Sequence, residues 1–515
     1  MSNAKSPPEG GLQPAQDFSP AFRTLLACLA FTLPALAHVG SPDIYYEGNA
    51  GPYHLNVTIQ MPQTVPGIAT VFIRSTTAGI SQMRLAPMAL LESTKLSPTP
   101  DLAQQSAADP KFFTGHVWLM EPSGFQIHLQ ADGALGHGEL GVPGTAMPQK
   151  VLPMQRGLGV LLFILMLFLS AGMVTIIGVS VREAQLEPGV IPSSNDVRKK
   201  RIAMVVGGIF VLAVLMAGNN WWSVEARSEI AKTQPIHLVA SLHSGNLLAL
   251  NLPDQKAEIR PGVYAPLWRL YAPAKLLPDH NHLMHLFLVR TPAMDQFWHL
   301  HPDPSGDHAW FGANLPSLPA GHYRLFADIV QITGAAPTLI GDIDLPDVVG
   351  GSLHDDDSGG PLPPLPLAAG DRAVCSLPGG YRMVWERDSS PLKARTYTVF
   401  RFHVEDKNGN VVSDLTPYMG MAGHAEFVRD DLSTFAHVHP MGDVSMAAVQ
   451  LAEASYTNPP SNPHAGHMMM MHEMSVPPIV TFPYGFPQPG RYRIFVQVKR
   501  GGQILSGAFD ATVNP

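Results

Sequence analysis

The sequence predicts a mainly β protein with three immunoglobulin-like β-sandwich domains, two transmembrane helices and an N-terminal signal segment. Three observations lead to this fold class. Short runs of alternating apolar and polar residues recur between turns, and the 515 residues include 49 prolines and 46 glycines. Two apolar stretches are long enough to cross a bilayer. The C-terminal half contains an internal repeat, and a chain of this length needs more than one hydrophobic core.

Composition limits the function classes. Charged residues make up only 14% and the net charge is −8, so the chain has no basic character typical of nucleic-acid-binding proteins. It contains 22 histidines and 23 methionines but only 2 cysteines, Cys28 and Cys375, for which we predict no disulfide. Imidazole and thioether groups without thiols suit late transition metals in an oxidising compartment.

The first segment, 1–37, is expected to be an N-terminal tail and signal peptide. Its apolar part, 22–37, carries Arg23 near its start and ends at 35–37 in a small-residue cleavage site. An exported chain is therefore expected to begin near residue 38.

Two transmembrane helices are expected at 157–181 and 202–222, and the second ends in an interfacial pair of tryptophans. The loop 182–201 between them contains a basic run, which the positive-inside rule places in the cytoplasm. The alternative, two buried helices of a soluble protein, would seldom combine such apolar segments with charges only at their ends.

This topology has a consequence for the rest of the chain. Residues 38–155 and 223–515 would both lie on the periplasmic or extracellular side of the cytoplasmic (inner) membrane of a bacterium. The protein is thus expected to be integral to the membrane and to carry most of its mass outside the cytoplasm.

The module 38–155 contains short alternating runs at 54–60, 69–74 and 125–130, which indicate a small β-sandwich. It resembles the YtkA-like domain family, and this resemblance implies an immunoglobulin-like fold outside the cytoplasmic membrane. The residues that carry the resemblance are Gly51, Pro52, Tyr53, His54, Pro66, Gly67, Ala69, Val71, 112–117 and 124–127.

The internal repeat defines two further sandwich domains, 233–348 and 371–515, joined by a linker at 349–370. The segment 285–302 reappears as 424–440 with one residue of slippage. The linker is rich in aspartate and proline and is expected to be solvated. Each copy is followed by the same ordered residues: Phe311, Pro319, Gly321, Tyr323 and Arg324 in the first, and Phe482, Pro487, Gly490, Tyr492 and Arg493 in the second.

Three histidines recur at matching positions of the repeats, and we predict that each set binds a metal ion. Residues i and i+2 of a strand project from one face, so His299 and His301 point together. An upstream strand carrying His285 would add a third imidazole if it were their neighbour. Imidazole suits copper, zinc or nickel, and protons should displace the metal as the pH falls through about 6 to 7. The matching residues of the second repeat are His424, His437 and His439.

Other readings of these residues stay open. The histidines could be half-exposed polar residues on a sandwich face. His280 and His282 could enrich the first site or lie in a polar loop. The repeated arginines, Arg290 and Arg429, could close strand ends by pairing with nearby aspartates.

A proline-flanked loop near the C-terminus is rich in methionine and histidine. It has neither helical nor strand periodicity, so burial of the whole set is not expected. Thioether sulfur selects Cu(I), and added imidazole allows Cu(II) to bind. The predicted copper ligands of this loop are His464, His467, Met468, Met469, Met470, Met471, His472 and Met474.

The mature N-terminus is a third candidate site. Cleavage after Ala37 would give His38 a free α-amino group, and His54 could complete a histidine brace. Such an arrangement resembles periplasmic copper-resistance proteins of sandwich fold. Without cleavage, His38 is only the first exported residue.

These observations favour a binding protein over an enzyme, because no phosphate loop, zinc-protease motif or paired nucleophilic cysteine is present. The C-terminal repeats resemble bacterial export-side heavy-metal and copper-binding β-sandwich proteins, which implies copper as Cu(I) or Cu(II), with zinc as second choice. The expected function is copper capture, buffering or delivery, with another export-side metal-handling protein as a possible partner. One alternative is a membrane-tethered adhesion or assembly module without a metal role, and another is a mononuclear metalloenzyme.

Overall fold

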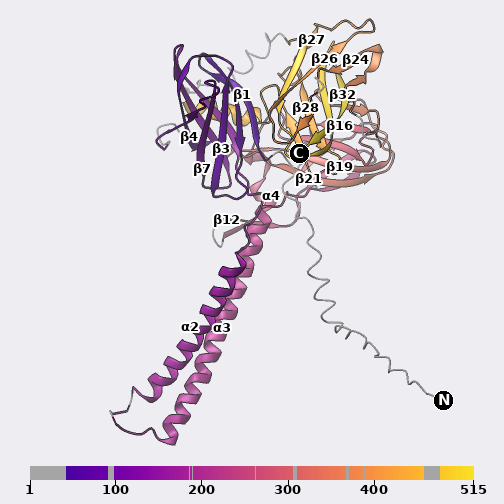
Figure 1. Cartoon of the computed structure of the whole chain (residues 1–515). Coiled ribbons are helices and arrows are strands. Elements are labelled where there is room, and N and C mark those ends of the chain that lie inside the picture. The colour runs from indigo at the N-terminus through magenta and orange to yellow at the C-terminus, as the bar shows by residue number, and fades with distance from the viewer. Residues whose placement is uncertain are drawn as a thin grey trace, which may run out of the picture. The chain divides into compact units, whose positions relative to one another are not determined.

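The computed structural model describes residues 42–90, 98–184, 186–187, 189–260, 263–305, 310–366, 371–387, 390–456 and 476–515 (Figure 1). The expected signal segment, His38 and the methionine-histidine loop lie outside the described residues. The chain is mainly β, and its strands form three two-sheet sandwiches, as the sequence predicts.

The first sandwich occupies the expected N-terminal module. Its strands alternate buried and half-buried side chains, as β2 does, because one face of each sheet lies on the core. Val57 and Val71 of one sheet and Met83 and Ile127 of the other share that core. One sheet is β1 (Ile44–Ala50), β2 (Tyr53–Gln60), β3 (Gly67–Ser75), β7 (Phe112–Leu119) and β6 (Gln104–Gln105); the other is β5 (Asp101–Leu102), β4 (Ile80–Ala89), β8 (Gly124–Gly133) and β9 (Gly136–Thr145).

Two long helices follow, α2 (Arg156–Arg182) and α3 (Ser194–Lys232), and both are long and apolar enough to cross a membrane. They run side by side (Figure 1). Gly178 faces Met204 and Gly207 faces Ile177, so missing side chains allow the helices to approach closely. Their apolar side chains are mostly exposed, unlike those of a soluble core helix. The two helices are typical of a membrane-associated or exported protein.

The second helix is longer than the predicted span 202–222. It begins after Ser193, whose hydroxyl accepts from the Asp196 amide while the Asp196 carboxylate accepts from the Ser193 amide. With 39 residues it is about 58 Å long, against about 30 Å for a bilayer core. The capping box starts the helix before the basic run 198–201, and the helix ends at Lys232, past the predicted span. Both ends therefore extend beyond the apolar segment.

The first repeat is a sandwich whose sheets meet through residues such as Leu248, Leu286 and Leu288. One sheet is β10 (Val239–His243), β11 (Leu247–Asn251), β18 (Phe311–Asn314) and β17 (Asp303–Pro304); the other is β21 (Thr338–Leu345), β19 (Gly321–Asp328), β15 (His285–Thr291), β16 (Gln296–Leu300) and β22 (Ser358–Pro361). Shorter elements are β12 (Lys256–Arg260), β13 (Val263–Pro266), α4 (Leu267–Leu270), a 3-10 turn (Pro273–Lys275), β14 (Leu276–Leu277) and β20 (Val330–Gln331).

The second repeat has the same plan, with Phe400 and Ile494 in its core. One sheet is β23 (Val374–Ser376), β24 (Arg382–Trp385), β26 (Thr398–Glu405) and β30 (Ile479–Tyr484); the other is β25 (Leu392–Lys393), β32 (Gln503–Asn514), β31 (Gly490–Arg500), β28 (His424–Arg429) and β29 (Phe435–Val438), with β27 (Leu415–Thr416) beside β31. A 3-10 turn (Pro378–Gly380) and α5 (Met446–Tyr456) complete it.

The two repeats match in detail, which supports their reading as homologous domains. Strands β19, β15 and β16 of the first pair in the same order as β31, β28 and β29 of the second. The repeated tyrosines also agree: Tyr323 donates to the Pro319 carbonyl at 2.8 Å and Tyr492 to the Gln488 carbonyl at 2.9 Å.

The expectation of a solvated linker at 349–370 is wrong for its middle part. There β22 pairs with β16, Ser358 is buried, and Leu362 and Leu365 pack against an apolar cluster. Proline and aspartate content predicted solvent exposure, but β22 stands at the edge of its sheet, where prolines are tolerated. The segment is part of the first repeat.

The outer faces of the two histidine-bearing sheets pack against each other. Phe297 stacks on Phe495 with ring centroids 4.2 Å apart, and Phe326 stacks on Phe435 at 4.3 Å. Phe287 belongs to the same cluster. The sheet of β15 is thus buried on both faces, and the histidines of the two repeats are brought together at this interface.

Candidate metal centres

The first histidine set converges as the strand argument predicts. Strand β15 pairs with β16 so that Phe287 lies opposite His299, which places His285 close to the second strand. Ligand atoms of His285, His299 and His301 all lie within 4.8 Å of one another. His285 and His299 are buried, and His301 is half-buried. We call this set the first centre.

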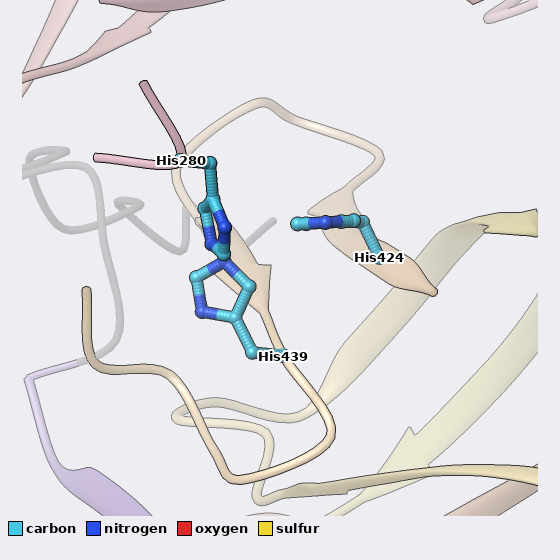
Figure 2. Close-up of side chains that lie close together, drawn as sticks. All are labelled: His280, His424 and His439. Carbon is cyan, nitrogen blue, oxygen red and sulfur yellow. The ribbon is translucent and has the colours of Figure 1, made fainter. Parts of the chain in front are cut away.

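The second set differs from the expected His424, His437 and His439. The ligand atoms within 4.8 Å of one another belong to His280, His424 and His439, which we call the second centre. All three are buried, and Figure 2 shows their rings close together. His280 belongs to the first repeat. It lies beside His424 and His439 because the two repeats pack against each other. His437 adjoins the centre, with its Nε2 3.0 Å from Nδ1 of His424.

The last histidine of each repeat is held in the same way. His301 Nδ1 lies 3.0 Å from an Asp357 carboxylate oxygen, and His439 Nδ1 lies 3.0 Å from the Val444 carbonyl. The Nε2 atoms of both rings are buried and have no hydrogen-bond partner among the described residues. An imidazole fixed through one nitrogen, with the other nitrogen left over, is the usual arrangement of a metal-ligating histidine.

A chain of hydrogen bonds fixes the proton on His299. Tyr418 donates to the Asp356 carbonyl at 2.8 Å, so the Ser358 hydroxyl, 3.1 Å away, must donate to Tyr418. The Ser358 oxygen therefore accepts from Nε2 of Gln497. The Gln497 Oε1 then faces His299 Nδ1 at 3.1 Å, and since Oε1 can only accept, Nδ1 must carry the proton. In neutral His299, Nε2 is left with a lone pair.

A single hydrogen bond fixes the position of the proton on His285. Its Nε2 lies 3.1 Å from the Asp279 carbonyl, which can only accept, so Nε2 carries the proton and Nδ1 a lone pair. That Nδ1 lies 3.1 Å from His299 Nε2, which also carries a lone pair. Two acceptors facing each other at this distance repel, and a cation between them would satisfy both. Two nitrogens bound to one tetrahedral ion at about 2.0 Å would lie about 3.3 Å apart.

The second repeat reproduces this arrangement. Nε2 of His424 lies 3.3 Å from the Tyr418 carbonyl, which leaves Nδ1 to face His437 Nε2 at 3.0 Å. His437 Nδ1 lies 3.4 Å from a carboxylate oxygen of Asp328. Asp328 is the residue of the first repeat that matches Gln497 of the second repeat. The same geometry in both repeats argues against an accidental placement.

These imidazoles are neutral at physiological pH. Burial lowers the pKa of His285 to about 3 and that of His439 to about 4. Burial also holds the pKa values of His299, His301 and His424 well below the usual range. Neutral imidazole is the ligating form. The expected loss of metal between pH 6 and 7 assumed exposed imidazoles. Because these imidazoles are buried, protons should compete with the metal for them only at more acidic pH.

Two carboxylic acids, the fully buried Glu426 and the half-buried Asp328, lie beside the centres and were not singled out from the sequence. Glu426 takes the place of Phe287 in the second repeat, is fully buried, and has no hydrogen-bond partner among the described residues. Burial raises its pKa well above the usual range and raises that of Asp328 to about 7. The only sequence signal was a charged residue inside an apolar strand.

The remaining predicted residues have different outcomes. His54 is tied to Asn49 at 2.9 Å and to Glu47 at 2.6 Å, and its proposed partner His38 lies outside the described residues. The ring of His282 stacks on His301 at 3.9 Å, so this histidine joins the first centre's surroundings. The eight ligands proposed in the methionine-histidine loop, 464–474, also lie outside the described residues.

The repeated arginines are structural. Arg290 binds both carboxylate oxygens of Asp295, at 2.9 Å and 2.5 Å, and Arg429 pairs with Asp431. Both lie at the ends of the histidine-bearing strands, as one of the open readings expected.

A family model described as a domain of unknown function (DUF8832) matches residues 376–515, the second repeat. No curated protein matches the chain.

Solved structures resemble the chain only weakly. A tetra-tandem repeat from the extending region of a large adhesion protein is 6% identical, with 88% of this chain and 72% of that chain covered and a TM-score of 0.15. A 1.5-MDa bacterial ice-binding adhesin is 6% identical, with 90% and 99% covered and a TM-score of 0.14. A putative membrane-anchored protein from Corynebacterium diphtheriae is 8% identical, with 93% and 97% covered and a TM-score of 0.13.

Proposed function

We propose that this chain is a membrane-anchored, export-side metal-binding protein that captures, buffers or delivers copper. The observation that carries the proposal is the pair of facing lone pairs on His285 Nδ1 and His299 Nε2, 3.1 Å apart in a buried setting. His301 Nε2, buried and without a hydrogen-bond partner among the described residues, would complete a three-imidazole site.

Copper is proposed from the chemistry of the whole chain. Three imidazoles alone suit copper and zinc equally. The run of methionines at 468–471 adds thioethers, which select Cu(I), and only 2 cysteines are available as thiol ligands. Ions collected by that loop could pass to the strand histidines or onward to another export-side protein.

The proposed location is the cytoplasmic membrane of a bacterium, with both histidine-bearing repeats outside. The basic run Arg198, Lys199, Lys200 and Arg201 lies at the start of α3, and its charge favours the cytoplasmic side. The exported regions would then adjoin the start of α2 and the end of α3, on the other side of the membrane from the loop that joins the two helices.

The test is metal binding by the full-length chain in detergent. After chelation and reloading with copper, the wild type should retain bound ions, and His301→Asn should lose one of them. Asparagine can keep the contact with Asp357 but supplies no imidazole. The matched control is His403→Asn, since His403 is a half-buried strand histidine held by Glu386 and Glu405 away from both centres.

The alternative function is a membrane-tethered adhesion or assembly module. It rests on the architecture alone, three sandwiches on a membrane anchor, and treats the histidines as packing residues. It predicts that the wild type binds no copper after reloading and that His301→Asn changes nothing. A metalloenzyme would instead require turnover by the loaded protein, with a group such as Asp357 or Glu426 serving as acid or base.

A further inference from the structure

The histidine of the second centre that comes from the first repeat is presented by a tight turn. Asp279 and His282 exchange backbone hydrogen bonds of 2.8 Å and 2.9 Å. Between them, His280 and Asn281 have φ values of 49° and 70°, a left-handed backbone that residues other than glycine adopt at a cost. This turn fixes the direction of the His280 side chain.

The second repeat has the same turn with different residues. Tyr418 and Met421 exchange hydrogen bonds of 2.8 Å and 3.0 Å, and between them Met419 and Gly420 have φ values of 49° and 77°. Where the first repeat carries His280, the second carries a methionine. The two centres therefore cannot be identical copies.

The turn of the first repeat is anchored to the second repeat. An Asp279 carboxylate oxygen accepts from the Ala447 amide at 2.8 Å, and Ala447 lies in α5. Val444, just before that helix, supplies the carbonyl that holds His439. The same short segment thus positions both the turn that carries His280 and a histidine of the second repeat.

The rings of the second centre meet across this contact. The centroid of His280 lies 5.2 Å from that of His424 and 5.1 Å from that of His439. All three side chains are buried. His424 and His439 come from one repeat and His280 from the other, so undocking the repeats would remove one of the three imidazoles.

We propose that the second centre is a joint site for a second late first-row ion, copper or zinc, and that it takes this ion only while the repeats are docked. Occupancy and docking are then linked: the bound ion holds the two repeats together, and separation of the repeats releases it. This inference rests on the proposed metal-binding function and adds that the chain has two unlike centres, one within a repeat and one between repeats.

The experiment counts ions per full-length chain in detergent after copper loading. His280→Asn removes one imidazole of the second centre, and asparagine tolerates the left-handed backbone. It should retain one ion fewer than the wild type, as should His301→Asn at the first centre, and the double variant two fewer. His439→Asn tests the second centre from the other repeat and should match His280→Asn. The control is His322→Asn, an exposed strand histidine bound to Asp344.

Linkage is measured on the same samples by denaturant unfolding. Copper should raise the unfolding midpoint of the wild type more than that of His280→Asn, while the midpoints without metal stay close. If His280→Asn and His439→Asn keep the wild-type count but His301→Asn loses an ion, the joint site is overturned and the proposed function stands. If His301→Asn also keeps the count, the proposed function fails together with the joint site.

Discussion

The position of single protons decides what the buried histidines can do. His285 and His299 each give their one proton to a fixed acceptor, and their remaining nitrogens face each other. Much of this was predictable from the sequence, because i and i+2 residues of a strand share a face and antiparallel neighbours are close. The roles of the Asp279 carbonyl and of Gln497 were not predictable, since both depend on tertiary contacts.

The residues of the second centre could not all be predicted from strand spacing and the repeat. His437 was expected as a ligand because it matches His299 in the repeat, and its Nε2 lies 3.0 Å from Nδ1 of His424. The third histidine of the group within 4.8 Å is nevertheless His280. Only the docking of one repeat on the other brings His280 there. The sequence offered no more than a histidine-rich turn whose role stayed open.

We predict that Gln497→Leu weakens copper binding at the first centre by about 10- to 100-fold. Leucine removes the acceptor that holds the proton on Nδ1 of His299, so the ring can turn or change tautomer. Copper affinity of the full-length chain, measured by competition with a chelator, checks this. Gln503→Leu, at the exposed first residue of β32, should bind like the wild type. Equal affinities for all three proteins would contradict the proton assignment.

Most strands were predictable from the sequence, and the exception is β22. The alternating runs in the N-terminal module and the repeated pairs β15–β16 and β28–β29 follow from side-chain period and from the repeat itself. Strand β22 was missed, because its composition resembles a linker. It is stabilised by pairing with β16 and by the Asp357 contact with His301, and neither leaves a periodic signal in a short glycine- and proline-rich segment.

We predict that Gly359→Ala displaces β22 and disturbs the first centre. Gly359 has a φ of 137°, and a Cβ there would lie 2.4 Å from the Phe297 carbonyl oxygen. The strand must shift, which should cost about 1–3 kcal/mol of unfolding free energy and move Asp357 away from His301. Denaturant unfolding and copper counting on the full-length chain measure both effects.

The control for that change lies in the same segment. A Cβ at Gly351 meets no atom within 4 Å, so Gly351→Ala should leave stability and copper binding unchanged. If Gly359→Ala behaved like Gly351→Ala, β22 would not be a structural support of the first centre.

For the whole molecule, the fold class and the number of sandwiches followed from the sequence, whereas the packing of one repeat on the other did not. The run 285–289 is buried throughout, which is typical of a strand covered on both faces, but a short apolar run does not reveal what covers its second face. That partner is the sheet of the second repeat. The resemblance of 38–155 to YtkA-like domains stays a prediction.

The central claim is that strand histidines, and not only the methionine loop, hold the metal. X-ray absorption spectroscopy of the full-length chain loaded with one equivalent of copper tests it most directly. We expect a first shell of imidazole nitrogens at about 2.0 Å that is lost when His285, His299 and His301 are replaced together. A first shell dominated by sulfur at about 2.3 Å, unchanged by those replacements, would contradict it.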